Sequence, residues 1–313
     1  MSEPASSSYS LGVDGGGSKT LAIIVDAQGK QRGQGLSGSS NYAAVGLNQA
    51  VTHIRSAVEE AAGEAGCTLP LHAAWLGLAG IDRQDDCDTL LPHLRSLAET
   101  VYLTNDAELL LSALDNAVGV ALIAGTGSIA LARNAQGSIK RASGWGHILG
   151  DEGSGYDIGR RALQAATRAA DGREPATALL ELIMQHWNLT SADGLIGKVY
   201  HAADKADIAQ ISTLVFAAAR SGDSTAREII RQAAQELALA AITVGANVGA
   251  TARDYPYDDP VGPLPIALGG GLLLHEEDFR EQVLDAIRER RAVGQIALVT
   301  QPALSAARAA IHL

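Results

Sequence analysis

A four-part pattern that occurs twice limits the possible folds more than any other feature of the sequence. Gly-Gly-Gly-Ser at 15–18 is followed by Asp-Ala-Gln-Gly at 26–29, and Gly-Thr-Gly-Ser at 125–128 is followed by Asn-Ala-Gln-Gly at 134–137. Each glycine-rich segment stands between two short apolar runs. The two spacings differ by two residues, which keeps strand side chains on the same faces because the strand period is two. We interpret the pattern as an internal duplication of a β-hairpin whose first turn is rich in glycine.

Strands and helices alternate along the first part of the chain. Apolar runs predict strands at 11–13, 21–25, 73–78, 101–104, 118–124 and 129–132. Leu47, Val51, Ile54 and Val58 share one face of a predicted helix, and the leucines of 90–97 predict a second helix. Such alternation with short connections is typical of a parallel α/β sheet. The next part is mainly helical, with helices predicted at 156–170, 176–186, 207–220 and 225–244. A last α/β segment follows, with a strand at 264–268, a helix at 278–288, a strand at 296–299 and a helix at 302–313.

Composition excludes several classes of protein. The 313 residues suffice for two domains, and the formal net charge of −11 argues against nucleic-acid partners, which require clustered Lys and Arg. Residues 1–10 lack the features of a signal peptide, and no apolar stretch reaches the ~20 residues that span a bilayer. Cys67 and Cys87 have no close ligand spacing and are typical of reduced thiols. We therefore expect a cytoplasmic protein with no membrane partner.

Three glycine-rich turns, 15–17, 125–127 and 269–271, each follow a predicted buried strand. Glycine lets backbone N–H groups approach a phosphate without a Cβ in the way. A P-loop is excluded because Ser18 separates Gly17 from Lys19 and a strand follows. A dinucleotide fingerprint must open a helix, whereas the segment after 127 soon reaches a turn. The turns therefore indicate two loops that bind one polyphosphate from two duplicated domains.

Two carboxylates stand at predicted strand ends. Asp14 precedes the first glycine-rich turn, where it could hold Mg²⁺, and Asp106 follows the strand 101–104. Carboxylates at the C-terminal ends of parallel strands point towards the ligand crevice. The structural alternatives are a turn-forming role for Asp14 and a helix N-cap at Asp106.

Residues 144–155 combine many glycines with Trp145, His147, Asp151 and Glu152. A sugar site requires a flat apolar face and convergent carboxylates, which this stretch could supply. The alternative is a purely structural loop. For His147, a hydrogen-bonded structural role is favoured over catalysis or metal binding.

Taken together, these segments resemble the BadF/BadG/BcrA/BcrD ATPase family, and within it the N-acetylglucosamine kinase branch. The resemblance spans almost the whole chain in the family's order, and the segment GWGHILGDEGSGY is highly specific. The matching segments are GVDGGGSKT at 12–20, GSSNY at 38–42, LTNDA at 103–107, IAGTGSIA at 123–130, GWGHILGDEGSGYDIG at 144–159 and ALGGGLL at 267–273.

The resemblance implies a role for each matching position. Asp106 resembles the catalytic base, and Asp14 resembles the residue that serves Mg²⁺. The ATP-binding positions are Gly15, Gly16, Gly17, Ser18 and Lys19 in a first phosphate loop, Gly125, Thr126, Gly127 and Ser128 in a second, and Gly269, Gly270 and Gly271 in an adenosine turn. The sugar-binding positions are Asn41, Asp106, Gly144, Trp145 and Asp151. Tyr42-Ala43-Ala44-Val45 stands where the mammalian enzyme type has a tryptophan, which leaves the choice of substrate open.

The resemblance implies an α/β fold of two duplicated ribonuclease-H-like (actin-like ATPase) domains with a central cleft. We expect a small domain at 1–115, a larger one with a helical insertion at 116–300, and a terminal helix, 301–313, that packs on the first. The expected ligands are ATP, Mg²⁺ and an amino sugar, and we expect a homodimer. N-acetylglucosamine is the expected substrate, phosphorylated on its 6-hydroxyl, with glucosamine and N-acetylmuramic acid as alternatives. An iron–sulfur activator ATPase of a radical dehydratase and a non-enzymatic sugar sensor are the other classes, and neither the cysteines nor the charge favours them.

Overall fold

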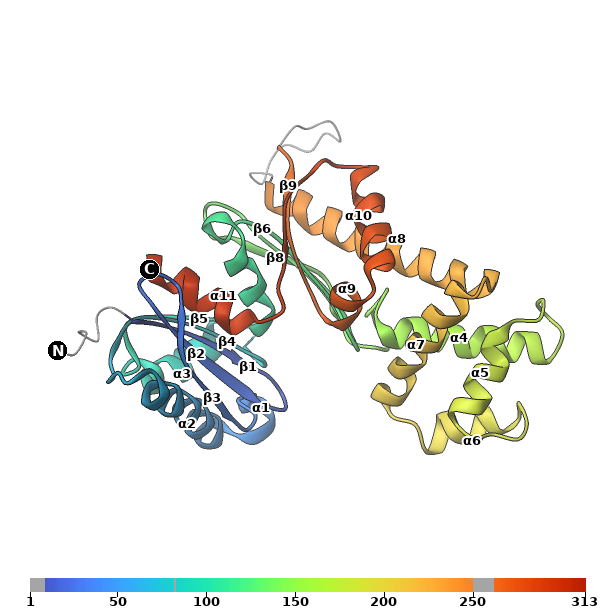
Figure 1. The fold of residues 1–313 in the computed structure, drawn as a ribbon, viewed down its shortest axis with the longest axis horizontal. Coiled ribbons are helices and arrows are strands. Elements are labelled where there is room, and N and C mark those ends of the chain that lie inside the picture. The colour runs from blue at the N-terminus through green and yellow to red at the C-terminus, as the bar shows by residue number, and fades with distance from the viewer. Residues whose placement is uncertain (1–8, 82, 250–261) are drawn as a thin grey trace. The chain divides into compact units, whose positions relative to one another are not determined.

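The computed structural model of the chain describes residues 9–81, 83–249 and 262–313. The chain forms two compact units (Figure 1). Unit 1 contains the described residues up to Val118 together with Val299–Leu313, and unit 2 is Gly119–Leu298. The sequence predicts these boundaries at 115 and 300.

Unit 1 is built on a five-stranded mixed sheet of order β3-β2-β1-β4-β5. Its strands are β1 (Tyr9–Gly15), β2 (Thr20–Asp26), β3 (Gln31–Ser37), β4 (Leu71–Leu78) and β5 (Ala98–Thr104). The first three strands form an antiparallel meander, and β1, β4 and β5 run parallel. Its helical elements are α1 (Tyr42–Val45), α2 (Leu47–Ala65), α3 (Gln84–Leu94), α11 (Pro302–Ala309) and the 3₁₀ segments η2 (Asp106–Ala113), η3 (Asp115–Ala117) and η4 (Ala310–His312).

Unit 2 repeats the same sheet in the order β8-β7-β6-β9-β10. Its strands are β6 (Gly119–Ala124), β7 (Ser128–Arg133), β8 (Ile139–Ser143), β9 (Leu264–Gly269) and β10 (Val293–Leu298). Here too the first three strands form an antiparallel meander, and β9 and β10 join β6 in parallel. The predicted duplication of the α/β fold is therefore confirmed, strand by strand.

The duplication extends to the turns that close the two hairpins. In the first, Asp26 Oδ1 accepts hydrogen bonds from the N–H groups of Gln28 and Lys30, at 3.0 and 2.9 Å. In the second, Asn134 Oδ1 accepts from Gln136 and Ser138, at 3.0 and 2.8 Å. A glycine with positive φ follows in each turn, at 74° and 80°. Asp and Asn commonly bond their own backbone two residues further on, so either residue supports the same turn.

Helices account for most of unit 2 outside its sheet. Ser154 caps α4 because its Oγ accepts from the N–H of Asp157, at 3.2 Å. The long α8 packs against α10, α7 and strands β6 to β8, and it supplies many of the buried residues of the unit. The helices are α4 (Gly155–Ala170), α5 (Ala178–His186), α6 (Gly194–His201), α7 (Lys205–Arg220), α8 (Ser224–Gly249), α9 (Gly271–His275) and α10 (Glu277–Arg288).

Helix α11 covers β1 and β2 from the far end of the chain. Ala303 and Ala307 of the helix are fully buried against Ile23 and Val25. The approach is so close that a Cβ on Gly12 would overlap the carbonyl oxygen of Ala303. Gly12 is therefore required by backbone proximity between helix and strand.

The substitution Gly12→Ala should lower the free energy of unfolding by about 1–3 kcal/mol, because the added methyl forces α11 away from β1. Urea denaturation of the purified variants measures this loss. Gly17→Ala is the matched control, because a Cβ at Gly17 meets no atom. Equal stability of the Gly12→Ala variant and the wild type would contradict the close approach.

The structure differs from the sequence-based elements in several places. Strands β3 and β8 extend each predicted hairpin to three strands. Residues 42–45, predicted as a loop, form the short helix α1, and α6 lies in a segment without a predicted element. Strand β3 reads Gln-Arg-Gly-Gln-Gly-Leu-Ser. Its glycines pack under α2, so the strand has no apolar alternation to detect.

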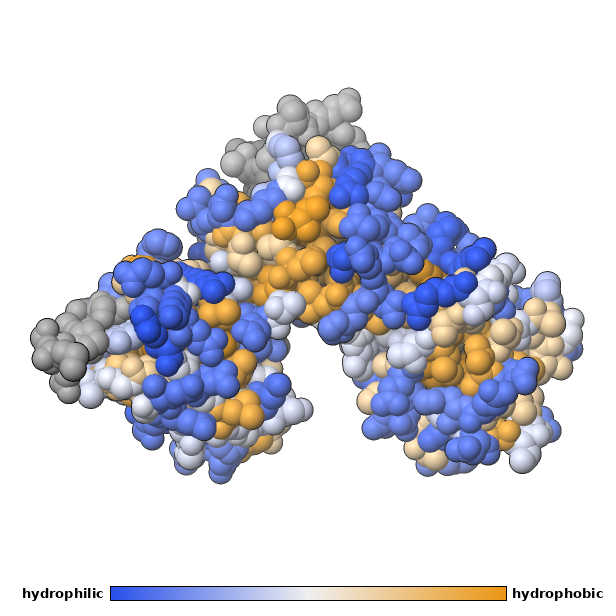
Figure 2. Space-filling model, viewed as in Figure 1, coloured by the Kyte–Doolittle hydropathy of each residue, from blue (hydrophilic) through white to orange (hydrophobic). Residues whose placement is uncertain are grey.

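Polar residues cover much of the surface, with smaller apolar patches between them (Figure 2). Within the described residues, none of the helices has the length and apolar character that crossing a bilayer requires.

Candidate active site

In unit 1, the predicted residues gather where the parallel strands β1, β4 and β5 end. Asp14 lies beside Gly77 of β4, and Gly77 lies beside Thr104 of β5. Asp106 follows two residues after β5 ends, as the first residue of η2. The sheet therefore brings Asp14 and Asp106 to one edge although 92 positions separate them (106 − 14).

Asp14 and Asp106 interact electrostatically. Burial, the negative charge of Asp106 and the positive charge of Lys19 act on Asp14, and the balance raises its pKa from 3.8 to about 6. Two carboxylates in a partly desolvated place resist being ionised together, and a bound cation would relieve that repulsion. The pair is therefore a suitable partial ligand set for a hard divalent cation.

Neither structural alternative accounts for these two residues. Asp14 lies within β1 and not in a turn. The cap of η2 is Asn105, whose Oδ1 accepts from the N–H of Ala107 at 3.0 Å. The Asp106 carboxylate also accepts from this N–H, at 2.9 Å, which fixes its orientation.

The first glycine-rich turn protrudes from the same edge of the sheet. The N–H of Gly16 donates to the carbonyl of Lys19, at 2.9 Å, and Gly17, Ser18 and Lys19 are exposed. Gly15 is buried, and a Cβ there would overlap the side chains of Ser40 and Leu78. Gly15 therefore permits close packing beneath the turn, and the exposed residues leave its tip open to a ligand.

Asn41 contacts the loop that follows β4. Its Oδ1 is buried without a hydrogen-bond partner among the described residues, and a Cβ on Gly80 would approach it to 2.6 Å. The carbonyl of the neighbouring Ile81 accepts from Asn105 Nδ2, at 3.0 Å. The loop thus connects Asn41 to the segment that carries Asp106.

In unit 2, the second and third glycine-rich turns lie against each other. A Cβ on Gly270 would overlap the backbone of Ala124, and Gly270 has a φ of 84°. A Cβ on Gly125 would lie 3.8 Å from the nitrogen of Gly271. The carbonyl of Gly125 accepts from the N–H of Gly155 at the start of α4, at 2.8 Å. Gly269 ends β9, so all three elements meet at the end of β6.

The segment after β8 forms a tight loop with exposed apolar residues. Gly144 begins it with a φ of 70°, and Trp145 and Gly150 pair through an N–H···O bond of 2.9 Å. Trp145 is 63% exposed, and the Arg141 guanidinium lies 4.5 Å from the centroid of its ring. The loop therefore exposes a flat aromatic side chain on unit 2.

His147 contacts Tyr156 edge-to-face, with ring centroids 4.9 Å apart, which agrees with a structural role. A cavity of about 350 Å³ lies beside this loop, lined by His147, Ile148, Leu149, Gly150, Asp151, Glu152, Tyr156, Asp157 and Arg160.

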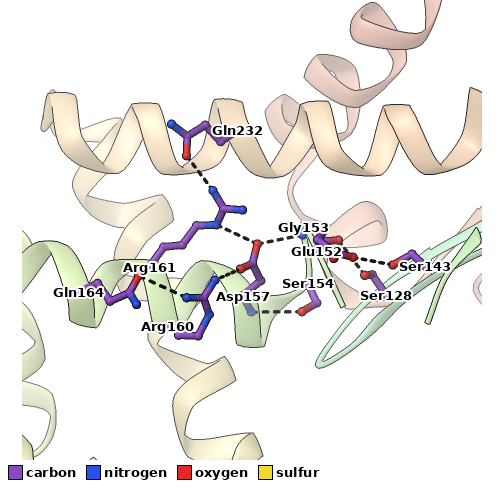
Figure 3. Close-up of polar contacts among 10 residues, drawn as sticks. All are labelled: Ser128, Ser143, Glu152, Gly153, Ser154, Asp157, Arg160, Arg161, Gln164 and Gln232. Atoms are coloured by element: carbon purple, nitrogen blue, oxygen red, sulfur yellow. Dashed lines mark hydrogen bonds and ion pairs between the residues drawn. The ribbon is translucent and has the colours of Figure 1, made fainter. Parts of the chain in front are cut away.

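Asp151 and Glu152, adjacent in sequence, have different surroundings. Asp151 is 8% exposed and accepts from Lys205 Nζ at 2.9 Å. Glu152 accepts from Ser143 Oγ at 3.1 Å, and its carbonyl accepts from Ser128 Oγ at 2.8 Å (Figure 3). Ser128, predicted to bind ATP, thus anchors the second turn to this loop. Lys205 belongs to no motif, and sequence analysis missed it.

Asp157 holds the start of α4 together (Figure 3). It is 5% exposed and accepts from Arg160, Arg161 and the N–H of Gly153, at 2.7, 2.9 and 3.1 Å. Burial raises the pKa of Asp157, but these hydrogen bonds outweigh it and hold the pKa below 3.8. The cluster therefore fixes the loop 151–154 against the helix.

The duplicated sheets, each with three antiparallel strands and two further parallel strands, define an α/β protein with the actin-like ATPase fold. This confirms the predicted fold class. A family model matches residues 11–310, and the chain belongs to the BadF/BadG/BcrA/BcrD ATPase family.

The chain is similar to several kinases with known names and to solved structures. The chain is 36% identical over 236 residues to the N-acetylmuramic acid/N-acetylglucosamine kinase of Clostridium acetobutylicum, covering 74% of this chain and 77% of that protein. It is 32% identical to the N-acetyl-D-glucosamine kinase of Dictyostelium discoideum, covering 72% and 76%. The structure of a provisionally named N-acetylglucosamine kinase from Chromobacterium violaceum superposes with a TM-score of 0.70 at 26% identity, covering 97% and 99%.

Proposed function

We propose that this chain is an ATP-dependent kinase that phosphorylates the 6-hydroxyl of N-acetylglucosamine. The observation that carries the proposal is the pair of carboxylates at the sheet edge of unit 1, where burial and the negative charge of Asp106 raise the pKa of Asp14 to about 6. Phosphoryl transfer requires positioning and charge neutralisation more than covalent chemistry; Asp106 would position the sugar hydroxyl, and a cation at Asp14 would neutralise phosphate charge. Family membership and the names of the relatives support the same class of reaction.

In this mechanism the two carboxylates have separate tasks. Asp106 accepts the proton of the sugar hydroxyl, and the N–H of Ala107 holds the carboxylate in place. Asp14, at the end of β1, would hold the Mg²⁺ that neutralises phosphate charge. Among the described residues no group of three potential metal-binding side chains occurs, so phosphate and water oxygens would complete the coordination of Mg²⁺.

Each unit, taken by itself, carries glycine-rich turns suited to nucleotide phosphate. Unit 1 supplies the exposed turn Gly16–Lys19, and unit 2 supplies the turn Gly125–Gly127 with the neighbouring Gly269–Gly271. Close backbone approach of this kind suits phosphate binding by N–H groups.

Two features, one in each unit, suit an acetamido sugar. Ala43 and Ala44 of α1 are small, exposed and apolar, which suits the acetyl methyl group. Trp145 offers an apolar face for the sugar ring. Of the two adjacent carboxylates, Glu152 is engaged by Ser143 Oγ, which does not favour it as a dedicated partner for the ammonium of glucosamine.

The cysteines argue against an iron–sulfur activator. Cys67 and Cys87 both pack against the core of unit 1.

A coupled ADP-release assay tests the proposed substrate. The kcat/KM for N-acetylglucosamine should exceed that for glucosamine and glucose by about tenfold or more, since a recess for one small group is worth about 1–3 kcal/mol. N-acetylmuramic acid should be the nearest competitor. A preference for glucosamine or glucose of tenfold would refute the acetamido assignment, and ADP release without any sugar dependence would refute the kinase.

A further inference from the structure

The Lys205 ammonium lies beside the second glycine-rich turn. Its Nζ would lie 3.4 Å from a Cβ built on Gly127, and the Asp151 carboxylate would lie 3.0 Å from the same point. Lys205 Nζ and Asp151 Oδ2 are 2.9 Å apart. The turn, the lysine and the carboxylate therefore form one compact group within unit 2.

The two members of the ion pair differ in exposure. The Asp151 side chain is 7% exposed, whereas the Lys205 side chain is 36% exposed. Asp151 is fixed by the loop between Gly150 and Gly153, but Lys205 is joined only by a flexible four-carbon chain to the first residue of α7. The ammonium can therefore move while the carboxylate stays.

We propose that Lys205 is a phosphate ligand of the bound nucleotide, which Asp151 holds beside Gly127 until the nucleotide arrives. This rests on the proposed function in one respect, namely that the second turn binds nucleotide phosphate. A phosphate at the turn carries more negative charge than Asp151 and offers several acceptor oxygens, so the ammonium exchanges one anionic partner for another.

The exchange has a consequence for Asp151. When Lys205 turns to the phosphate, the Asp151 carboxylate loses its ion-pair partner and becomes available as an acceptor. Since Asp151 is also the predicted sugar ligand of this loop, nucleotide binding in unit 2 would prepare the carboxylate for a sugar hydroxyl.

The test is calorimetric titration of ADP, a non-hydrolysable ATP analogue and adenosine into wild type and Lys205→Met. The variant should bind ADP and the analogue about 10- to 100-fold more weakly, the loss expected for one charge-assisted hydrogen bond, and should bind adenosine unchanged. Lys205→Arg keeps the charge and should restore most of the affinity.

Lys198→Met is the matched control. Lys198 also forms an ion pair in the helical part of unit 2, with Asp207 at 3.8 Å, and its loss removes the same charge. It should bind all three ligands as the wild type does.

Several outcomes would overturn the proposal. Unchanged ADP affinity in Lys205→Met would do so, as would an equal loss for adenosine or the same loss in Lys198→Met. A wild-type protein that binds ADP but phosphorylates no amino sugar would refute the proposed substrate and leave the assignment of Lys205 standing. A wild type that binds no ADP would refute both.

Discussion

Asp106→Asn should lower kcat by about 10²- to 10⁴-fold, the usual contribution of a general base. The amide cannot accept the proton of the sugar hydroxyl, but it keeps the shape of the side chain and an oxygen for the N–H of Ala107. Steady-state ADP release with saturating sugar and ATP measures the loss. Nucleotide affinity should stay within a few-fold of wild type, because the phosphate turns are unchanged.

Asp85→Asn is the control for this variant. Asp85 is an exposed carboxylate in the first turn of α3, also in unit 1, and its loss changes the net charge by the same amount. It should retain wild-type turnover. If Asp106→Asn retained it as well, Asp106 would have no place in the reaction.

Asp157→Asn should destabilise the protein by about 2–3 kcal/mol. Removing one partner of a buried ion pair leaves the remaining charge without compensation and commonly costs about 3–5 kcal/mol. The cost is smaller here because Arg160 and Arg161 are 42% and 24% exposed and can regain water. Urea denaturation at pH 7 measures the change.

The same pair of proteins should show a definite dependence on pH. Because the folded-state pKa of Asp157 lies below 3.8, its contribution to stability is present above the unfolded-state value and is lost as the pH falls through the folded-state value. The difference between wild type and Asp157→Asn should therefore be constant near neutrality and shrink below about pH 4. Asp171→Asn, at an exposed pair at the end of the same helix, should change stability little. A constant difference down to pH 2 would contradict the assignment.

Much of the fold follows from the sequence because the repeated turns have a local cause. The same side-chain hydrogen bonds at Asp26 and Asn134 produce the same hairpin in both units, so the repeated turn can be recognised in the amino-acid sequence. Strands β3 and β8 could not be predicted this way. They lie at sheet edges, and β3 is shaped by the packing of Gly33 and Gly35 under α2, a contact with residues some 30 positions away.

Some residues of the candidate site could likewise be predicted from the sequence, and others could not. Asp14 and Asp106 could be proposed because strand ends of a parallel sheet meet at one edge, which is a rule about topology. The ion pair of Asp151 with Lys205 could not, because the lysine begins a helix 54 positions later and no periodicity or motif surrounds it. The different surroundings of Asp151 and Glu152 likewise depend on tertiary packing, which cannot be predicted from two neighbouring residues in the sequence.

Unit 1 is interrupted by the whole of unit 2, and this has a consequence for biosynthesis. Strands β1 and β2 are synthesised roughly 280 residues before α11. The apolar face formed by Ile23 and Val25 therefore lacks its covering helix while unit 2 is translated. Unit 2, whose chain is continuous, can complete its core first. This apolar surface therefore stays uncovered until α11 is synthesised, and premature termination before Ala303 leaves it exposed.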